Sequence, residues 1–81
     1  MKVLKFEATW CAPCKALTKL LESVETDIVI EKIDIDTNME ITKQYGVRGI
    51  PTMVMIDDSG NEVKRGQSFR TVEDIQTFLK G

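Results

Sequence analysis

Hydrophobic residues change their spacing near the start of the chain. The β-compatible residues from Val3 to Ala8 predict a short strand that breaks at Thr9-Trp10. After Cys11 the spacing becomes that of one helix face, and the apolar residues of this stripe are Leu17, Leu20, Leu21 and Val24. Pro13 falls in the first helical turn, where its missing N–H has no intrahelical partner to lose. The pattern therefore predicts a strand followed by a helix that begins at Cys11.

The middle of the chain predicts a second strand and a short helix. Ile28 to Ile35 is β-branched and apolar, with charged residues interspersed, and this composition favours a strand. Asn38 to Tyr45 has the spacing of a short helix, with Asn38 in the N-cap position. Gly46 follows it and suits a helix C-terminus.

The last third of the chain predicts a hairpin and a final helix. Met53 to Ile56 is a continuous apolar run, which is typical of a strand covered on both faces. The turn-forming residues of 57–61 join it to a short strand around Val63. Thr71 and Asp74 have the spacing of a capping box. The apolar face of the helix that follows consists of Val72, Ile75, Phe78 and Leu79.

These elements follow one another in the order β-α-β-α-β-β-α and predict an α/β fold. The first βαβ unit is expected to be parallel with a right-handed crossover, and the closing strand pair antiparallel. The result is a mixed four-stranded sheet flanked by three helices. The chain has 81 residues, 42% hydrophobic and 30% charged, so we expect one ordered domain over residues 1–81.

Charge and hydropathy exclude several classes of partner. Eleven Lys and Arg against thirteen Asp and Glu give a net charge of −2 without a basic block, so no nucleic-acid surface is expected. No apolar run approaches the roughly 18 residues that a membrane span requires. The N-terminal residues Met1 to Phe6 lack the layout of a signal peptide. We therefore expect a cytoplasmic protein that binds neither nucleic acid nor a membrane.

The two cysteines, Cys11 and Cys14, carry the candidate chemistry. A disulfide that closes so short a loop stabilises by only about 2 kcal/mol, against about 3–5 for long loops, so a purely structural bond is disfavoured. A structural zinc site needs four Cys or His ligands, and a chain with two Cys and no His would have to share them in a dimer. We expect no metal. Exchange chemistry is the remaining prediction.

The position of the pair at a helix N-terminus suits exchange chemistry. Unpaired N–H groups and the positive end of the helix dipole stabilise a thiolate more than a thiol. Cys11 lies nearest the terminus, is expected to be exposed, and is the predicted nucleophile. Cys14, one turn further in, is expected to be shielded and to attack the mixed disulfide second.

Two motifs resemble the thioredoxin family. Trp10-Cys11-Ala12-Pro13-Cys14-Lys15 is similar to the thioredoxin motif Trp-Cys-Gly-Pro-Cys-Lys, with Ala12 in place of Gly. The segment from Tyr45 to Thr52 resembles the one that carries the cis-proline of that family. The resemblance implies a thioredoxin-like fold and a thiol–disulfide oxidoreductase that reduces protein disulfides. It implies no cofactor beyond a redox-active Cys11–Cys14 disulfide, a monomer, and recharging by a flavoenzyme of the thioredoxin-reductase type.

The same resemblance assigns the substrate-binding residues. Ile50-Pro51 is expected to be a cis peptide that faces the cysteines. The expected contact surface around Cys11 consists of Trp10, Ala12, Pro13, Gly49, Ile50, Pro51 and Gly66.

The sequence also departs from the family pattern. It begins at the strand that leads to the motif, so the first strand and helix of thioredoxins are expected to be missing and the strand at 28–35 to form a sheet edge. Lys5 stands where thioredoxins carry a buried Asp. We expect Lys5 to lie beneath Cys14 and favour its thiolate; the alternative is that its amine reaches solvent. Glu7 or Asp34 could supply the carboxylate that the family carries at the position of Lys5, and Lys15 is a further charge acting on the cysteine pKa values.

Two alternative functions stay open from the sequence. A glutaredoxin-like reductase would draw electrons from glutathione, but the motif lacks the Cys-Pro-Tyr-Cys character of that family and Phe69-Arg70-Thr71 lacks its Gly-Gly-Cys-Asp-like tripeptide-binding signal. A non-enzymatic adaptor would use the fold only to bind another protein. The intact cysteine pair argues against an adaptor.

Overall fold

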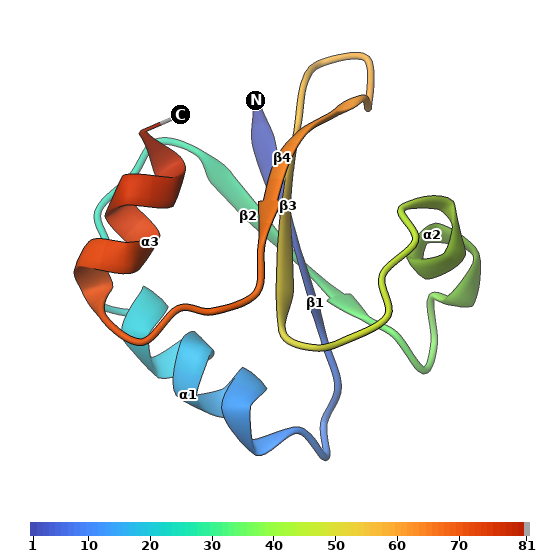
Figure 1. Cartoon of the computed structure of the whole chain (residues 1–81), viewed down its shortest axis with the longest axis horizontal. Helices are drawn as coiled ribbons and strands as arrows, with labels where there is room; N and C mark the ends of the chain where they lie inside the picture. The colour runs from blue at the N-terminus through green and yellow to red at the C-terminus, as the bar shows by residue number, and fades with distance from the viewer. Residues whose placement is uncertain (81) are drawn as a thin grey trace.

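Four strands form one mixed sheet in the order β2-β1-β3-β4 in the computed structural model, which describes residues 1–80 (Figure 1). Strand β1 (Lys2–Glu7) is parallel to β2 (Val29–Asp34) and antiparallel to β3 (Thr52–Ile56), which pairs antiparallel with β4 (Glu62–Gly66). Parallel neighbours need a crossover, and α1 (Ala12–Leu21) lies in it. The predicted element order and the mixed sheet are confirmed.

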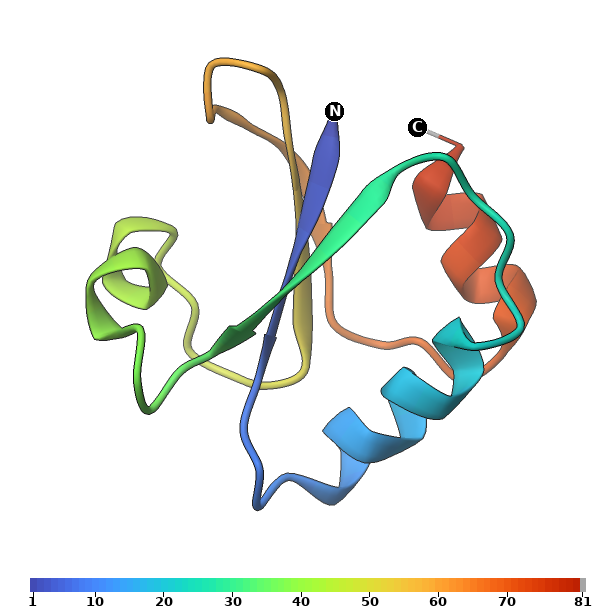
Figure 2. The ribbon, with the colours of Figure 1, turned by 180° about the vertical axis from the view of Figure 1, so that it is seen from behind.

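Helices cover both faces of the sheet. α1 and α3 (Val72–Leu79) lie on one side, and α2 (Met39–Gln44) lies on the other (Figures 1 and 2). Side chains alternate along β1, so Val3 packs toward α1 and α3 while Leu4 and Phe6 pack toward α2. All five residues of β3 are buried, as the continuous apolar run predicts. The sheet thus separates two apolar clusters.

Helix ends agree with the prediction in most details. The capping box of Thr71 and Asp74 is present, and Gly46 has a φ of 62°, which ends α2 in the left-handed region. Asn38 occupies the N-cap of α2, as predicted, although its side chain does not bond to the first turn of the helix. Its amide instead donates to the Asp34 carbonyl oxygen at 3.1 Å, which ties the helix start to the end of β2.

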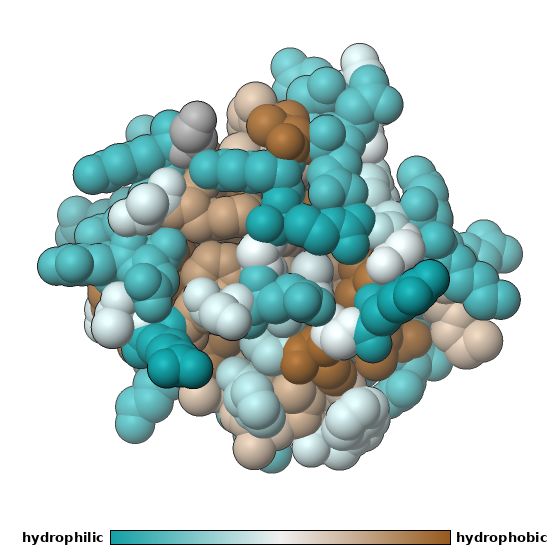
Figure 3. Space-filling view, viewed as in Figure 1, coloured by the Kyte–Doolittle hydropathy of each residue, from teal (hydrophilic) through white to brown (hydrophobic). Residues whose placement is uncertain are grey.

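Strand β2 lies at one edge of the sheet formed by the described residues. Its Glu31 forms an ion pair with Lys2 of β1 at 2.7 Å. On the face turned to the viewer in Figure 3, hydrophilic side chains cover most of the periphery and hydrophobic ones reach the surface near the centre. Within residues 1–80, none of the helices has both the length and the apolar character needed to cross a bilayer.

Candidate redox site

Cys11 and Cys14 form a disulfide at the start of α1, and their Cα atoms lie 5.2 Å apart. Cys11 is the N-cap residue, with an extended backbone, and its Sγ accepts the backbone N–H of Cys14 at 3.1 Å. The Cys11 N–H donates in turn to the Ala8 carbonyl oxygen at 3.2 Å, so the turn after β1 is fixed by hydrogen bonds on both sides of Cys11. A sulfur atom therefore occupies the position that a Ser, Thr or Asp side chain takes at most helix starts.

The electrostatics of this helix start favour an anion at Cys11. The first turn of α1 contains no acidic residue, while Pro13 follows in it without an N–H of its own. The unpaired N–H groups and the positive end of the helix dipole point toward Sγ. A thiolate accepts the Cys14 N–H more strongly than a disulfide sulfur does. The helix start therefore stabilises the negative charge that forms on Cys11 when the disulfide opens.

Both sulfur-bearing residues are buried. Cys14 is 2% exposed, as predicted, whereas Cys11 is only 5% exposed, so the expectation of an exposed nucleophile is wrong. Ala8, Ile35 and Ile50 pack around the disulfide and cover it. The covering residues come from three separate segments, which spacing within one motif does not reveal.

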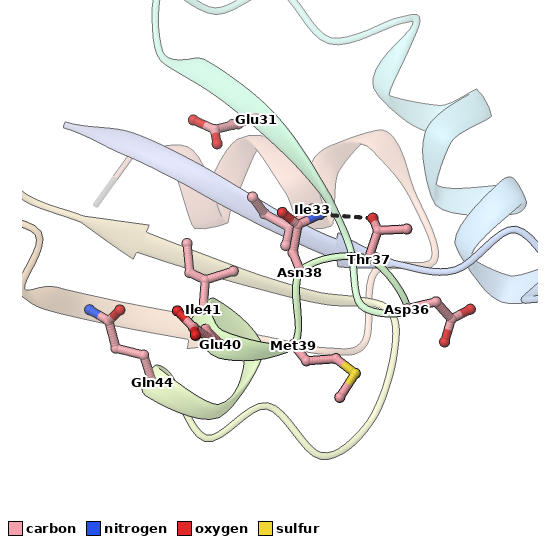
Figure 4. A pocket seen from close by; sticks show the side chains of 9 residues that line it. All are labelled: Glu31, Ile33, Asp36, Thr37, Asn38, Met39, Glu40, Ile41 and Gln44. Atoms are coloured by element: carbon pink, nitrogen blue, oxygen red, sulfur yellow. Dashed lines mark hydrogen bonds between the residues drawn. The ribbon is translucent and has the colours of Figure 1, made fainter.

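Trp10 and Ala12 flank Cys11 at the surface. Trp10 is 67% exposed, and its Nε1 donates to Asp36 Oδ2 at 2.9 Å. Asp36 also lines a cavity of about 610 Å³ between β2 and α2, where Figure 4 shows its carboxylate at the end of the pocket. Asp36 was not among the site residues predicted from the sequence. The lone indole N–H next to the motif, which needs an acceptor, was the available signal.

The Ile50-Pro51 peptide is cis, which confirms the expectation. The loop that carries it is held by the buried hydroxyl of Thr52, which donates to the Gly49 carbonyl oxygen at 2.5 Å and accepts from Gln67 Nε2 at 3.0 Å. Gln67 follows β4, so these two bonds join the loop to the segment between β4 and α3. Neither Thr52 nor Gln67 was predicted from the sequence to belong to the site.

The structure brings some of the predicted contact residues together. Ile50 packs against the buried cluster that contains both cysteines, and Pro13 and Pro51 line one groove beside α1. Gly66 lies at the end of β4, where an added Cβ would fall 2.8 Å from Phe69 Cζ, so a side chain there would have to displace the aromatic ring. Glycine at position 66 thus allows Phe69 to pack closely on the end of β4.

Lys5 is buried beneath α1. Its side chain is 1% exposed, and its Nζ donates to Glu7 Oε1 and, at 2.5 Å, to Thr18 Oγ1. Thr18 donates to the Cys14 carbonyl oxygen at 3.1 Å. The alternative that the amine reaches solvent is therefore wrong. Thr18, which no sequence motif indicated, lies one turn after Cys14 and connects it with the buried ion pair.

The other charged side chains have simpler surroundings. Lys15 is exposed on α1, and its backbone N–H donates to the Cys11 carbonyl oxygen at 3.2 Å.

Over residues 1–80, His, Cys, Asp and Glu side chains form no group of three or more that would suit a metal ion.

The sequence and the fold are similar to those of thioredoxins. A thioredoxin from Chlamydia caviae is 44% identical over 66 residues, which cover 78% of this chain and 64% of that protein. A thioredoxin from Mycobacterium tuberculosis is 40% identical over 67 residues, which cover 78% of this chain and 57% of that protein. The matched part of the chain thus spans less than two thirds of these relatives.

Solved thioredoxins share the fold over a larger part of their length. A mutant thioredoxin from Halobacterium salinarum has a TM-score of 0.85 at 32% identity, covering 96% of this chain and 70% of that one. Thioredoxin 1 from Thermosipho africanus has a TM-score of 0.77 at 28% identity, and the match covers 99% of this chain and 96% of that one. The family model Thioredoxin matches residues 1–81. With a family model matched along its whole length and a cystine at the start of α1, the chain belongs to the thioredoxin family.

Proposed function

We propose that this chain is a thiol–disulfide oxidoreductase that reduces protein disulfides. One observation carries the proposal: the Cys11–Cys14 disulfide lies at a helix N-terminus with Cys11 Sγ as the acceptor of the Cys14 N–H. This arrangement stabilises the product of disulfide opening on the side of Cys11. Cys11 is accordingly the nucleophile, and Cys14 is the resolving residue.

The reaction proceeds in two exchanges from the reduced state. The Cys11 thiolate attacks one sulfur of the substrate disulfide, forms a mixed disulfide and expels the other substrate sulfur as a thiolate, which takes a proton from solvent. The Cys14 thiol gives up its proton to solvent, and the resulting thiolate attacks Cys11 Sγ. The mixed disulfide breaks, the second substrate thiolate leaves, and the Cys11–Cys14 disulfide forms. The substrate gains two electrons and the chain loses two.

The contact surface for the substrate surrounds Cys11. Trp10 and Ala12 are exposed next to it, and Ile50 packs against the buried cluster that contains both cysteines. Pro13 and Pro51 line the adjoining groove. An added Cβ would lie 3.1 Å from Gln67 Nε2 at Gly49 and 2.8 Å from Phe69 Cζ at Gly66, so both glycines have little room for a side chain. An extended substrate strand laid along residues 49–51 would have main-chain groups to pair with.

Three charged residues act on the cysteine thiolates in this proposal. Lys5 connects with Cys14 through Thr18, and Glu7 pairs with Lys5. Lys15 adds a positive charge in the first turn of α1. The chain is proposed to act as a monomer in the cytoplasm, with its own disulfide as the only redox group. A flavoenzyme of the thioredoxin-reductase type would return electrons to it.

Insulin reduction tests the proposal. With dithiothreitol present, the wild type should accelerate precipitation of the insulin B chain, and Cys11→Ser should abolish the acceleration. Pre-reduced Cys14→Ser, mixed with insulin after the dithiothreitol is removed, should instead accumulate a mixed disulfide on Cys11, detectable by mass spectrometry, because the resolving thiol is gone. Insulin left intact by the wild type would refute the function. If the protein reduces insulin with NADPH, glutathione and glutathione reductase, but not with NADPH and thioredoxin reductase, the proposed electron donor is wrong.

A further inference from the structure

A groove of about 700 Å³ runs from the redox site along α1. Pro13 and Pro51 lie at the site end, and Leu20 and Phe69 provide apolar lining further along. Its two walls are α1 and the segment that joins β4 to α3, which pass side by side in both ribbon views (Figures 1 and 2). A polypeptide bound at Cys11 has this groove as a continuous extension of its contact surface.

The groove is positively charged on both walls. Lys19 comes from α1 and Arg70 from the segment before α3. Of the described residues that line the groove, none is acidic, although the whole chain carries a net charge of −2. Within residues 1–80, neither cation has a carboxylate at ion-pair distance. The nearby Asp74 carboxylate accepts the backbone N–H groups of Arg70 and Thr71, and it attracts the Arg70 charge only from beyond ion-pair distance.

The opposite side of the redox site has the opposite charge. Asp36, which holds the Trp10 indole, lines the cavity between β2 and α2 together with two other acidic residues, Glu31 and Glu40. A negatively charged segment is therefore repelled on the Trp10 side and attracted on the α1 side. Cations flanking an apolar groove are complementary to a peptide that combines apolar and acidic side chains.

We infer that the groove between α1 and residues 67–70 binds an acidic segment that flanks the target disulfide in the substrate protein. This inference rests on the proposed function. It makes Lys19 and Arg70 specificity-determining residues, which select the substrate without taking part in the exchange itself. Two exposed ion pairs of ordinary strength would raise the rate of reduction of an acidic substrate about threefold to tenfold over a neutral one, and added salt would lower the difference.

Two synthetic peptides provide the test. They are identical except that Glu residues flank the disulfide in one and Gln residues in the other. The pre-reduced protein is mixed with each peptide, and the single turnover is followed by the fluorescence of Trp10, the only tryptophan of the chain and a neighbour of Cys11. A single turnover needs no reductase, so charge changes in the groove cannot alter the measured rate by changing how fast the protein is re-reduced.

The variants isolate the two cations. In Lys19→Gln/Arg70→Gln the ratio of the two rates should fall to about one, and in Lys19→Glu/Arg70→Glu it should invert. The matched control, Lys43→Gln/Lys80→Gln, removes the same charge at two exposed positions outside the groove and should keep the preference. Equal thermal unfolding midpoints establish that the variants fold alike.

The possible outcomes distinguish a failure of this inference from a failure of the proposed function. No reduction of either peptide by the wild type overturns the proposed function. Equal rates for both peptides, or a preference that survives Lys19→Gln/Arg70→Gln, overturn the inference alone. Glutathione disulfide serves as a third probe: if the wild type reduces it faster than the acidic peptide and the double Gln variant loses that activity, the groove binds a glutathionyl group and the assigned occupant is wrong.

Discussion

The buried ion pair of Lys5 and Glu7 predicts an asymmetric response to mutation. Lys5 is 1% exposed, whereas the Glu7 side chain is 23% exposed. Glu7→Gln therefore leaves a cation in the interior without a counter-charge, although the new amide oxygen and the Thr18 hydroxyl can still accept hydrogen bonds from it. Lys5→Met leaves a carboxylate that water still reaches, and the methionine fills most of the volume of the lysine stem.

The magnitudes follow from this difference in exposure. Removing one partner of a buried pair costs about 3–5 kcal/mol, and Glu7→Gln should lie near 3 because the amide oxygen still accepts from Lys5. Lys5→Met should cost about 0–1 kcal/mol, and the double variant should lie within about 1 kcal/mol of the wild type, since apolar replacement of a whole buried pair is often neutral. The total free energy of unfolding of a domain of this size is about 4–12 kcal/mol.

Urea unfolding of the oxidised proteins, followed by far-UV circular dichroism, measures all four free energies of unfolding. The double-mutant cycle then gives the coupling energy between the two side chains, about 3 kcal/mol on these figures. A Lys5→Met variant less stable than Glu7→Gln would refute the reasoning, because it would mean that packing of the lysine stem outweighs the charge. A coupling energy near zero would show that the pair is not the source of the stability.

Three further perturbations have defined outcomes. A hydrogen bond from the backbone N–H of Arg70 lowers the pKa of Asp74. Its contribution to stability is therefore present above the unfolded pKa of about 3.9 and is lost as pH falls through the lower folded pKa, so the thermal unfolding midpoints of Asp74→Asn and wild type should start to approach each other near pH 4 and converge only below the folded pKa. Thr52→Val should lower stability by about 1–3 kcal/mol in urea and raise the insulin KM. Gly66→Ala should cost about 1–3 kcal/mol by displacing Phe69, and Phe69→Leu in the same chain should recover part of the loss.

The element order was predictable because each segment carries its own periodic signal. The helix stripe after Cys11 and the continuous apolar run at 53–56 identify α1 and the buried strand β3 without any tertiary information. The cap of α2 was predictable only in position. An Asn side chain can cap its own helix or bond elsewhere, and the carbonyl oxygen of Asp34, fixed by the end of β2, decides between them.

The cysteine motif locates the site, but the surroundings of the motif depend on segments distant in sequence. The burial of Cys11 results from Ile35 and Ile50, which lie 24 and 39 residues further along the chain. The interior position of Lys5 results from a carboxylate on its own strand and a hydroxyl on α1, and a lysine in a strand pattern is ordinarily placed with its amine in solvent. Pairing of this kind is a property of three-dimensional packing that no single segment encodes.

The polar contacts that the sequence did not reveal share one task, which is to join the segments of the site. Asp36 holds Trp10, Thr18 connects Cys14 with the buried pair, and Thr52 fastens the loop of Pro51. The two apolar clusters that fill the faces of the sheet contain neither cysteine. Opening and closing the disulfide therefore leaves the main core packing in place, so single changes at these polar residues should alter the rates of exchange more strongly than changes of equal stability cost in the core.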